Sequence, residues 1–275
     1  MDESTNFGVA TDSAISLSKP CDSAPISVLA DRGVWFQDWF RMLGHAESGE
    51  YLERISAWRR EWRPRRVRFL LVAESHVAEQ AGDVSVQVAL PASLRTVSLP
   101  AGFCRLVYCL GYGESQICHP SPQTNRGTWQ FWDIFGSIAS VFEPSVSARM
   151  PRRHESSPGA RLQWKVSVLN VLSSAGVWLE DASVIGIYGT GGARHAKGVT
   201  YRRLLRESFE RLVWPEVRGD NVEQVWVVGR GVAEALAGLP MISSDRVISQ
   251  PQDRNRDRYR SDLSRLLASI ALIRG

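Results

Sequence analysis

The chain alternates between short runs of apolar residues and longer segments in which apolar residues recur every three or four positions. Short runs bounded by polar residues predict buried strands, and the longer spacing predicts amphipathic helices. The predicted strands occupy residues 67–73, 177–179, 224–228 and 247–248. The predicted helices occupy residues 34–62, with a break near Gly44 and Gly49, then residues 131–138, 161–175, 200–213 and 231–238, and an Arg-rich segment that reaches the C-terminus. This alternation predicts an α/β fold, a three-layer α/β/α sandwich with a central, mostly parallel sheet.

The remaining segments suggest the domain organisation. Residues 1–25 are rich in Ser, Asp and Ala without strong periodicity and predict a flexible N-terminal arm, whereas residues 26–275 predict a single domain. No stretch approaches the roughly 20 apolar residues needed to cross a bilayer, and the acidic, polar start of the chain does not resemble a secretory signal. We therefore expect a cytoplasmic protein without a membrane partner.

The first predicted strand ends abruptly at Glu74, Ser75 and His76. Open α/β sheets place ligand chemistry just beyond the carboxyl ends of their strands, so a carboxylate, a hydroxyl and an imidazole are expected to face one crevice. The alternative is an ordinary strand exit whose polar residues cap a helix.

The arginines cluster at residues 59–68, 202–206 and 254–260, and the net charge is +4. Such clusters fit phosphate binding, although solvated basic faces are the alternative. A glycine-rich loop at 189–198 adds Arg194, His195 and Lys197, but it matches neither a dinucleotide fingerprint nor a Walker loop. Because the four cysteines contain no Cys-x-x-Cys pair, neither a metal site nor a cofactor is expected.

Four segments follow one another in an order known from a protein family. They are Ala73–His76 after the first strand, Asn125–Arg126 with Gln130–Trp132, Gly176–Asp181, and Gln250–Gln252 near the C-terminal helix. This order resembles the uracil-DNA glycosylase superfamily over about residues 65–265, and within it a divergent bacterial branch that includes phage-defence glycosylases. The resemblance implies a uracil-DNA glycosylase-like fold.

The resemblance, together with the arginine clusters and the glycines that flank Tyr112, predicts roles for particular residues. Those expected to take part in catalysis are Glu74, Ser75 and Gln250. Those expected to bind the substrate are His76, Tyr112 and Asp181. Those expected to contact DNA are Arg194, His195, Lys197, Gln252, Arg254 and Arg256. The implied activity is that of a monomeric DNA glycosylase, a hydrolase that flips a base out of double-stranded DNA and leaves an abasic site.

Asp181 stands where the uracil enzymes usually carry Asn, and an ionised Asp offers only hydrogen-bond acceptors. It suits the N4 amino group of cytosine, so we expect a modified cytosine as the substrate, such as the glucosylated hydroxymethylcytosine of phage DNA. The alternatives are an Asp181 that caps the next turn and a Tyr112 that is a buried structural residue instead of a stacking platform. At the level of function, the alternatives are a uracil or hypoxanthine repair glycosylase and a non-catalytic DNA-binding protein on the same fold.

Overall fold

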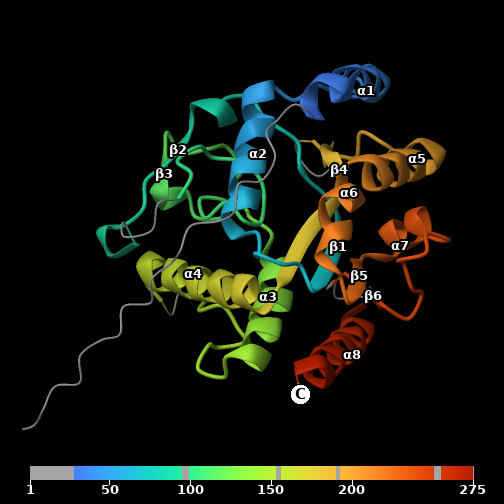
Figure 1. Cartoon of the computed structure of the whole chain (residues 1–275). Coiled ribbons are helices and arrows are strands. Elements are labelled where there is room, and N and C mark those ends of the chain that lie inside the picture. The colour runs from blue at the N-terminus through green and yellow to red at the C-terminus, as the bar shows by residue number, and fades with distance from the viewer. Residues whose placement is uncertain (1–27, 95–98, 153–155, 190–192, 251–254, 275) are drawn as a thin grey trace, which may run out of the picture.

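The computed structural model describes residues 28–94, 99–152, 156–189, 193–250 and 255–274 (Figure 1). Its centre is a four-stranded parallel sheet in the order β4–β1–β5–β6. The strands are β1 (Phe69–Val77), β4 (Val177–Tyr188), β5 (Gln224–Val228) and β6 (Val247–Ile248). A separate antiparallel pair joins β2 (Gln87–Val88) to β3 (Cys118–His119).

Helices flank the central sheet (Figure 1). They are α1 (Val28–Leu43), α2 (Gly49–Trp62), α3 (Trp129–Phe142), α4 (Pro158–Ala175), α5 (Gly198–Ser208), α6 (Trp214–Val217), α7 (Arg230–Leu236) and α8 (Arg256–Arg274). Helices α4 and α8 both pack against α3, while α5 packs against α7 and β4. The protein is therefore an α/β protein with a central parallel sheet, consistent with the predicted three-layer sandwich.

Local sequence explains how the elements around the sheet begin and end. The Ser157 hydroxyl accepts a hydrogen bond from the Ala160 amide at 3.1 Å and caps α4. Gly176 ends the same helix with φ at 76°, a left-handed conformation that glycine adopts without strain. Its carbonyl then accepts the Arg68 amide at 2.8 Å, which starts β4 beside β1.

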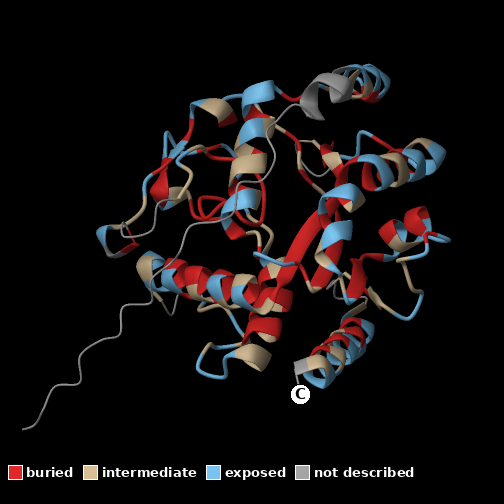
Figure 2. Ribbon diagram, in the orientation of Figure 1, coloured by how far each residue is buried: buried red, intermediate tan, exposed pale blue. Residues whose placement is uncertain are grey.

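The core follows the sheet, as the red segments of Figure 2 show. In β1, Phe69 to Ala73 are all buried, as expected for a strand that is covered on both faces. Among the described residues, no helix combines the length and the apolar character needed to cross a bilayer.

One sequence-based strand boundary needs correction. The strand expected to end at Glu180–Asp181 runs on to Tyr188, because Ala182, Ile185 and Ile187 continue its buried side chains. The predicted N-terminal arm, residues 1–25, lies outside the described residues.

Candidate functional site

The candidate site lies where the connections of the sheet change direction. From β1 the chain reaches β4 on one side of β1, and later β5 on its other side. The register pairs Val72 with Val227, so Glu74 and Gly229 lie at the same level, each two residues further along its strand direction. Ligands of open α/β proteins bind at this kind of position, beyond the carboxyl ends of strands at a topological switch point.

Glu74 is almost completely buried there, with 5% of its surface exposed. Its carboxylate accepts hydrogen bonds from the hydroxyls of Tyr188 and Tyr201. Burial, reinforced by the Glu74 charge, raises the pKa of the Tyr188 hydroxyl to about 12 and also raises that of Tyr201. Both tyrosines therefore remain protonated donors near neutral pH and hold the carboxylate in place.

Arg194 completes this cluster from the solvent side. Its Nη2 lies 3.1 Å from Glu74 Oε1, and its Nε and Nη2 donate to the Tyr188 hydroxyl at 3.0 and 2.7 Å. The guanidinium also lies 5.2 Å from the ring centroids of Tyr188 and Tyr201. Because 42% of the Arg194 side chain is exposed, it forms the outer layer over a buried carboxylate.

Backbone hydrogen bonds between the end of β4 and residues 193–195 position Arg194. The Gly189 amide donates to Ala193 O at 2.9 Å, and the His195 amide donates to Ile187 O at 2.9 Å. A Cβ at Gly189 would lie 2.5 Å from His195 Nε2, so a larger residue here would displace the His195 ring. His195 stacks on His45, with ring centroids 4.5 Å apart and an interplanar angle of 15°.

Gln250 approaches the same edge of the sheet from β6. The Gly229 amide donates to Ile248 O at 2.8 Å, which aligns the ends of β5 and β6. Gly229 has φ at 105°, and a Cβ built on it would lie 3.4 Å from Gln250 Nε2. The half-buried Gln250 amide therefore sits directly beside the backbone that follows β5.

Ser75 has a structural role here. Its hydroxyl donates to His76 O at 2.8 Å and accepts the Ile187 amide at 3.1 Å. The second of these bonds ties β1 to the last part of β4, next to Tyr188. Ser75 therefore supports the cluster around Glu74 by joining the two strands that carry its parts.

His76 and Asp181 belong to a second, buried network. His76 Nε2 lies 2.9 Å from Glu47 Oε1, and its Nδ1 lies 3.8 Å from Asp181 Oδ2. Asp181 binds the Arg59 guanidinium, whose Nε lies 2.8 Å from Glu180 Oε1. Since Asp181 is 3% exposed and its carboxylate is bound by Arg59, the structure does not support its expected contact with a base.

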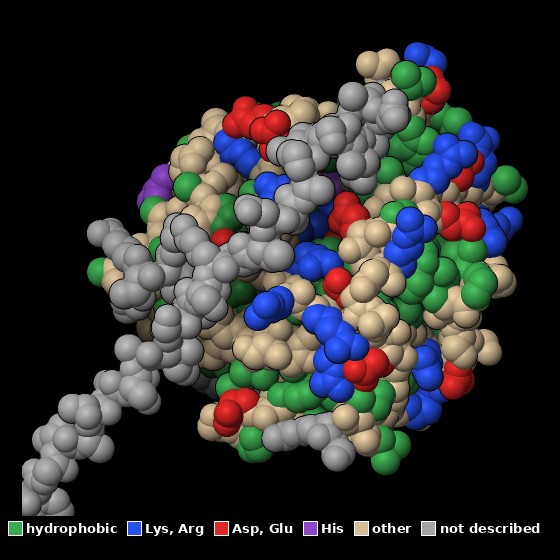
Figure 3. All heavy atoms as spheres, viewed as in Figure 1, with side chains coloured by type: hydrophobic (Ala, Val, Ile, Leu, Met, Phe, Trp, Pro, Cys, Tyr) green, Lys and Arg blue, Asp and Glu red, His purple; other side chains and the backbone are tan. Residues whose placement is uncertain are grey.

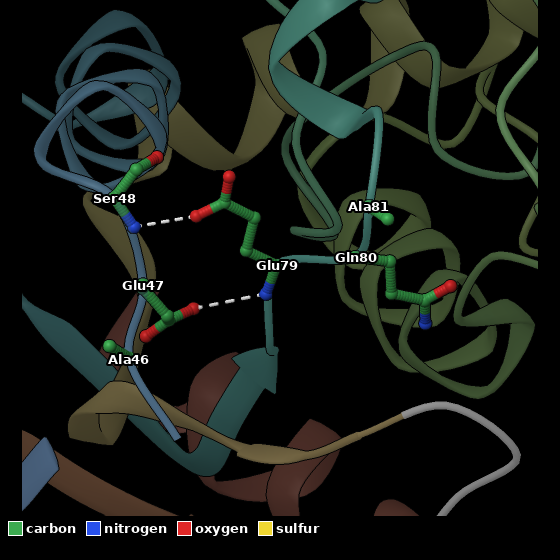
Figure 4. Close-up of a pocket in the computed structure, with 6 residues that line it drawn as sticks. All are labelled: Ala46, Glu47, Ser48, Glu79, Gln80 and Ala81. Atoms are coloured by element: carbon green, nitrogen blue, oxygen red, sulfur yellow. Dashed lines mark hydrogen bonds between the residues drawn. The ribbon is translucent and has the colours of Figure 1, made fainter. Parts of the chain in front are cut away.

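A shallow pocket borders the Glu47 end of this network (Figure 4). Its two carboxylates are already engaged, because Glu47 accepts the amides of Gly186 at 2.8 Å and Glu79 at 3.3 Å, and Glu79 accepts that of Ser48 at 2.6 Å. The bonds from His76 and Gly186 lower the pKa of Glu47 although burial, the largest single effect, raises it. This pocket therefore has a structural carboxylate at its base.

Tyr112 is a core residue and does not form an open platform. It is 7% exposed and meets the Phe103 ring edge to face, with centroids 6.5 Å apart. Asn125 fixes the surrounding loop by accepting the Gly113 amide at 2.6 Å and donating to Gly111 O at 2.8 Å. The alternative of a buried structural tyrosine is therefore the better description.

The other residues expected to contact DNA lie outside the Glu74 cluster. Lys197 precedes α5 and Arg256 begins α8, and both are exposed. Gln252 and Arg254 lie outside the described residues. Within the described ranges, no group of three or more His, Cys, Asp or Glu side chains is arranged to hold a metal ion.

Two of the cluster's residues were not among the expected site residues. Tyr188 was missed because β4 is longer than predicted, although the apolar residues at 184–187 could have indicated the continuation. Tyr201 stands on the predicted helix 200–213, but its hydrogen bond to Glu74 depends on the tertiary fold. No protein-family model matches this chain, and neither a curated protein nor a solved structure matches it.

Proposed function

We propose that this protein is a DNA glycosylase that hydrolyses the bond between a flipped base and its sugar. The observation that carries the proposal is the position of Glu74, a buried carboxylate at the switch point of a parallel sheet, next to Gly229 and near the Gln250 amide. Together these groups can stabilise the positive charge on the sugar and the negative charge on the departing base.

The reaction breaks the bond between C1′ and the base nitrogen, and the electron pair leaves with the base. Positive charge develops on the sugar, and a water molecule adds its oxygen to C1′ and gives up a proton, which ends on the departed base anion. In this proposal Glu74 stabilises the sugar cation or orients that water, while the Gln250 amide donates to the carbonyl oxygen of the departing base. These steps use groups of this chain alone.

The surface charge supports a polyanionic partner. Figure 3 shows Lys and Arg side chains gathered across the middle of one face, with acidic side chains among them. The segments that follow β4 and β6 add positive charge through three exposed side chains, Arg194, Lys197 and Arg256. Contacts of this kind bind phosphate without reading sequence.

The choice of base remains part of the proposal. A modified cytosine is the expected substrate if Asp181 leaves Arg59 when a base enters. Uracil or hypoxanthine is the alternative, since the Gln250 amide can donate to the carbonyl oxygen of each. A uracil-DNA glycosylase-like fold belongs to the same proposal, and the parallel sheet with polar residues at its carboxyl edge supports it.

The test is excision from a panel of duplexes that carry unmodified, methylated, hydroxymethylated or glucosylated cytosine, uracil or hypoxanthine. Alkaline cleavage at the abasic product is the readout. Wild type and Glu79→Gln, a control carboxylate outside the cluster, should release one base of the panel. Glu74→Gln should lose about 100-fold or more of this activity while still binding DNA.

A second candidate is a DNA-binding protein that does not excise bases. It is favoured by the groups that already surround Glu74, namely the Tyr188 and Tyr201 hydroxyls and the Arg194 guanidinium, although Glu74 Oε1 makes no hydrogen bond in this conformation. Duplex binding without release of any base in the panel would support this candidate and contradict the glycosylase proposal.

A further inference from the structure

An exposed tryptophan lies at the start of α3. Trp129 is 60% exposed, and among the large apolar side chains that the structure shows as exposed it is the aromatic one. The next turns of the helix bury Trp132 and Phe135 in the core, so packing accounts for these rings but leaves the Trp129 ring in solvent.

Trp129 lies toward the same edge of the sheet as Glu74. The C-terminal end of α3 packs against the start of β1, because the rings of Phe142 and Phe69 are 6.5 Å apart. Trp129 lies about 20 Å from Phe142 along the helix axis. Glu74 lies about 17 Å from Phe69 along the strand. Because Asp133 bonds Tyr259 of α8, and Asp262 of α8 bonds the residue that follows β6, the start of α3 lies at the carboxyl edge, as Glu74 does.

Helix α8 brings arginines to this position. The Tyr259 hydroxyl donates to Asp133 Oδ2 at 2.5 Å, which joins the first turns of α8 and α3. Trp129 lies one turn before Asp133, and Arg256 lies one turn before Tyr259. The Asp262 carboxylate accepts the Ser249 amide at 2.9 Å and holds this end of α8 against the end of β6.

The charge around the indole is mainly positive. Arg126, Arg256, Arg258 and Arg260 are all exposed on the adjoining loop and the first turns of α8. Among the described residues here, the acidic groups are Asp133, which accepts the Tyr259 hydroxyl, Asp257, which lies 3.9 Å from Arg260, and Asp262, which accepts the Ser249 amide. An exposed aromatic ring among arginines is the combination that binds single-stranded nucleic acid, because the ring stacks on a base and the guanidiniums contact phosphates.

We propose that Trp129, with Arg126 and Arg256, forms a stacking platform for an unpaired base of DNA. The inference rests on the proposed function for the identity of the polymer. It goes beyond that function because it assigns a second base contact on the α3–α8 side of the sheet, outside the cluster around Glu74. The platform holds a base that is already unstacked, next to the base that would be excised.

The test measures binding of fluorescein-labelled oligothymidylate of about 15 nucleotides and of a matched duplex by fluorescence anisotropy. Trp129→Ala should raise the Kd for the single strand by about 5- to 100-fold, with a smaller effect on the duplex. Trp129→Phe should retain most of the affinity. Arg256→Ala should instead lower the salt dependence of binding by about one unit of log–log slope.

Two exposed residues provide matched controls. Leu272, 82% exposed near the far end of α8, and Arg218, which precedes β5 at the opposite edge of the sheet, should tolerate Ala without a change in Kd. Wild-type affinity of Trp129→Ala would overturn the platform. A lower molar mass of this variant in solution would also overturn it, because Trp129 would then contact a second copy of the chain.

Binding and excision separate the two proposals. Tryptophan-dependent binding without excision of any base would leave the platform standing and contradict the glycosylase. If Trp129→Ala excises the base as fast as wild type and binds the single strand with wild-type affinity, the platform is contradicted and the glycosylase proposal stands.

Discussion

The Arg194 guanidinium lies over the Glu74 carboxylate, with Nη2 3.1 Å from Oε1, and forms its cover toward solvent. We therefore expect Arg194→Ala to expose Glu74. A water-soluble carbodiimide with an amine should then label Glu74 several-fold faster, as measured by peptide mass spectrometry. Arg203→Ala, which breaks an exposed pair with Glu207 at 3.0 Å, serves as the control. Equal labelling of Glu74 in wild type and Arg194→Ala would show that the tyrosines alone shield it.

Asp181→Asn should lower stability. The substitution removes one of the two carboxylates that bind the buried Arg59 guanidinium, and hydrogen bonds to charged groups contribute about 1.5–3 kcal/mol. Urea unfolding should show a loss of this size. The base contact expected for Asp181 from the sequence predicts a different result, a shift of Asp181→Asn from cytosine-type to uracil-type substrates. Unchanged stability together with such a shift would support that contact.

The pH dependence of stability should reveal Glu180. Burial, the largest effect, raises the pKa of this carboxyl to about 8, with a further increase from Asp181, although Arg59 opposes the shift. The folded state then binds the Glu180 proton more tightly than the unfolded state does. The stability that this contributes is present at low pH and is lost as the pH rises from the ordinary pKa of 4.5 to about 8.

Glu180→Gln removes this titration and keeps a neutral side chain. Between about pH 5 and about pH 8.5, wild type should therefore lose more unfolding free energy than the variant does. Chemical denaturation at both pH values measures the difference. Glu207→Gln, in the exposed pair with Arg203, should follow wild type. If wild type and Glu180→Gln lose the same unfolding free energy between the two pH values, Glu180 stays ionised beside Arg59.

Gly229→Ala should affect both stability and the site. The left-handed backbone at φ 105° costs about 1–3 kcal/mol for a residue with a Cβ, and this Cβ would lie in van der Waals contact with the Gln250 amide. Thermal unfolding should show the loss, and excision should fall with it. Gly238→Ala is the matched control, because it has φ at 84° and open space around its Cβ. If both variants reduce excision equally, Gln250 has no role in it.

The local pattern of apolar and polar residues was sufficient to predict many of the helices and strands. The run at 224–228 predicts β5 at its observed bounds, and the spacing at 161–175 predicts most of α4. Both signals depend on neighbours within a few residues, so the sequence carries them directly. The break near Gly44 and Gly49 likewise separates α1 from α2.

The interior of β4 could not be predicted in this way. Glu180 and Asp181 interrupt an apolar strand and resemble its end, but Arg59 of α2 binds both carboxylates from a position 122 residues before Asp181. That pairing exists only in the folded protein. The same reason applies to the candidate site, where Glu74 was expected from its position after an apolar run but its partner Tyr188 was not.

The sheet order has a consequence for how the Glu74 cluster can open. From Phe69 to Val72, strand β1 pairs with β4 on one edge and with β5 on the other, and from Ala73 onward it pairs with β4 alone. The amides paired on both edges belong to the part of the protein that exchanges hydrogen most slowly. The chain around Arg194 is tied back through the short bridge between Tyr188 and Arg194 and the His195 amide. The amides around Arg194 should therefore exchange through small local openings. The Glu74 carboxylate stays on the strand that continues the slowly exchanging backbone, while Arg194, which covers it, moves on a much faster timescale.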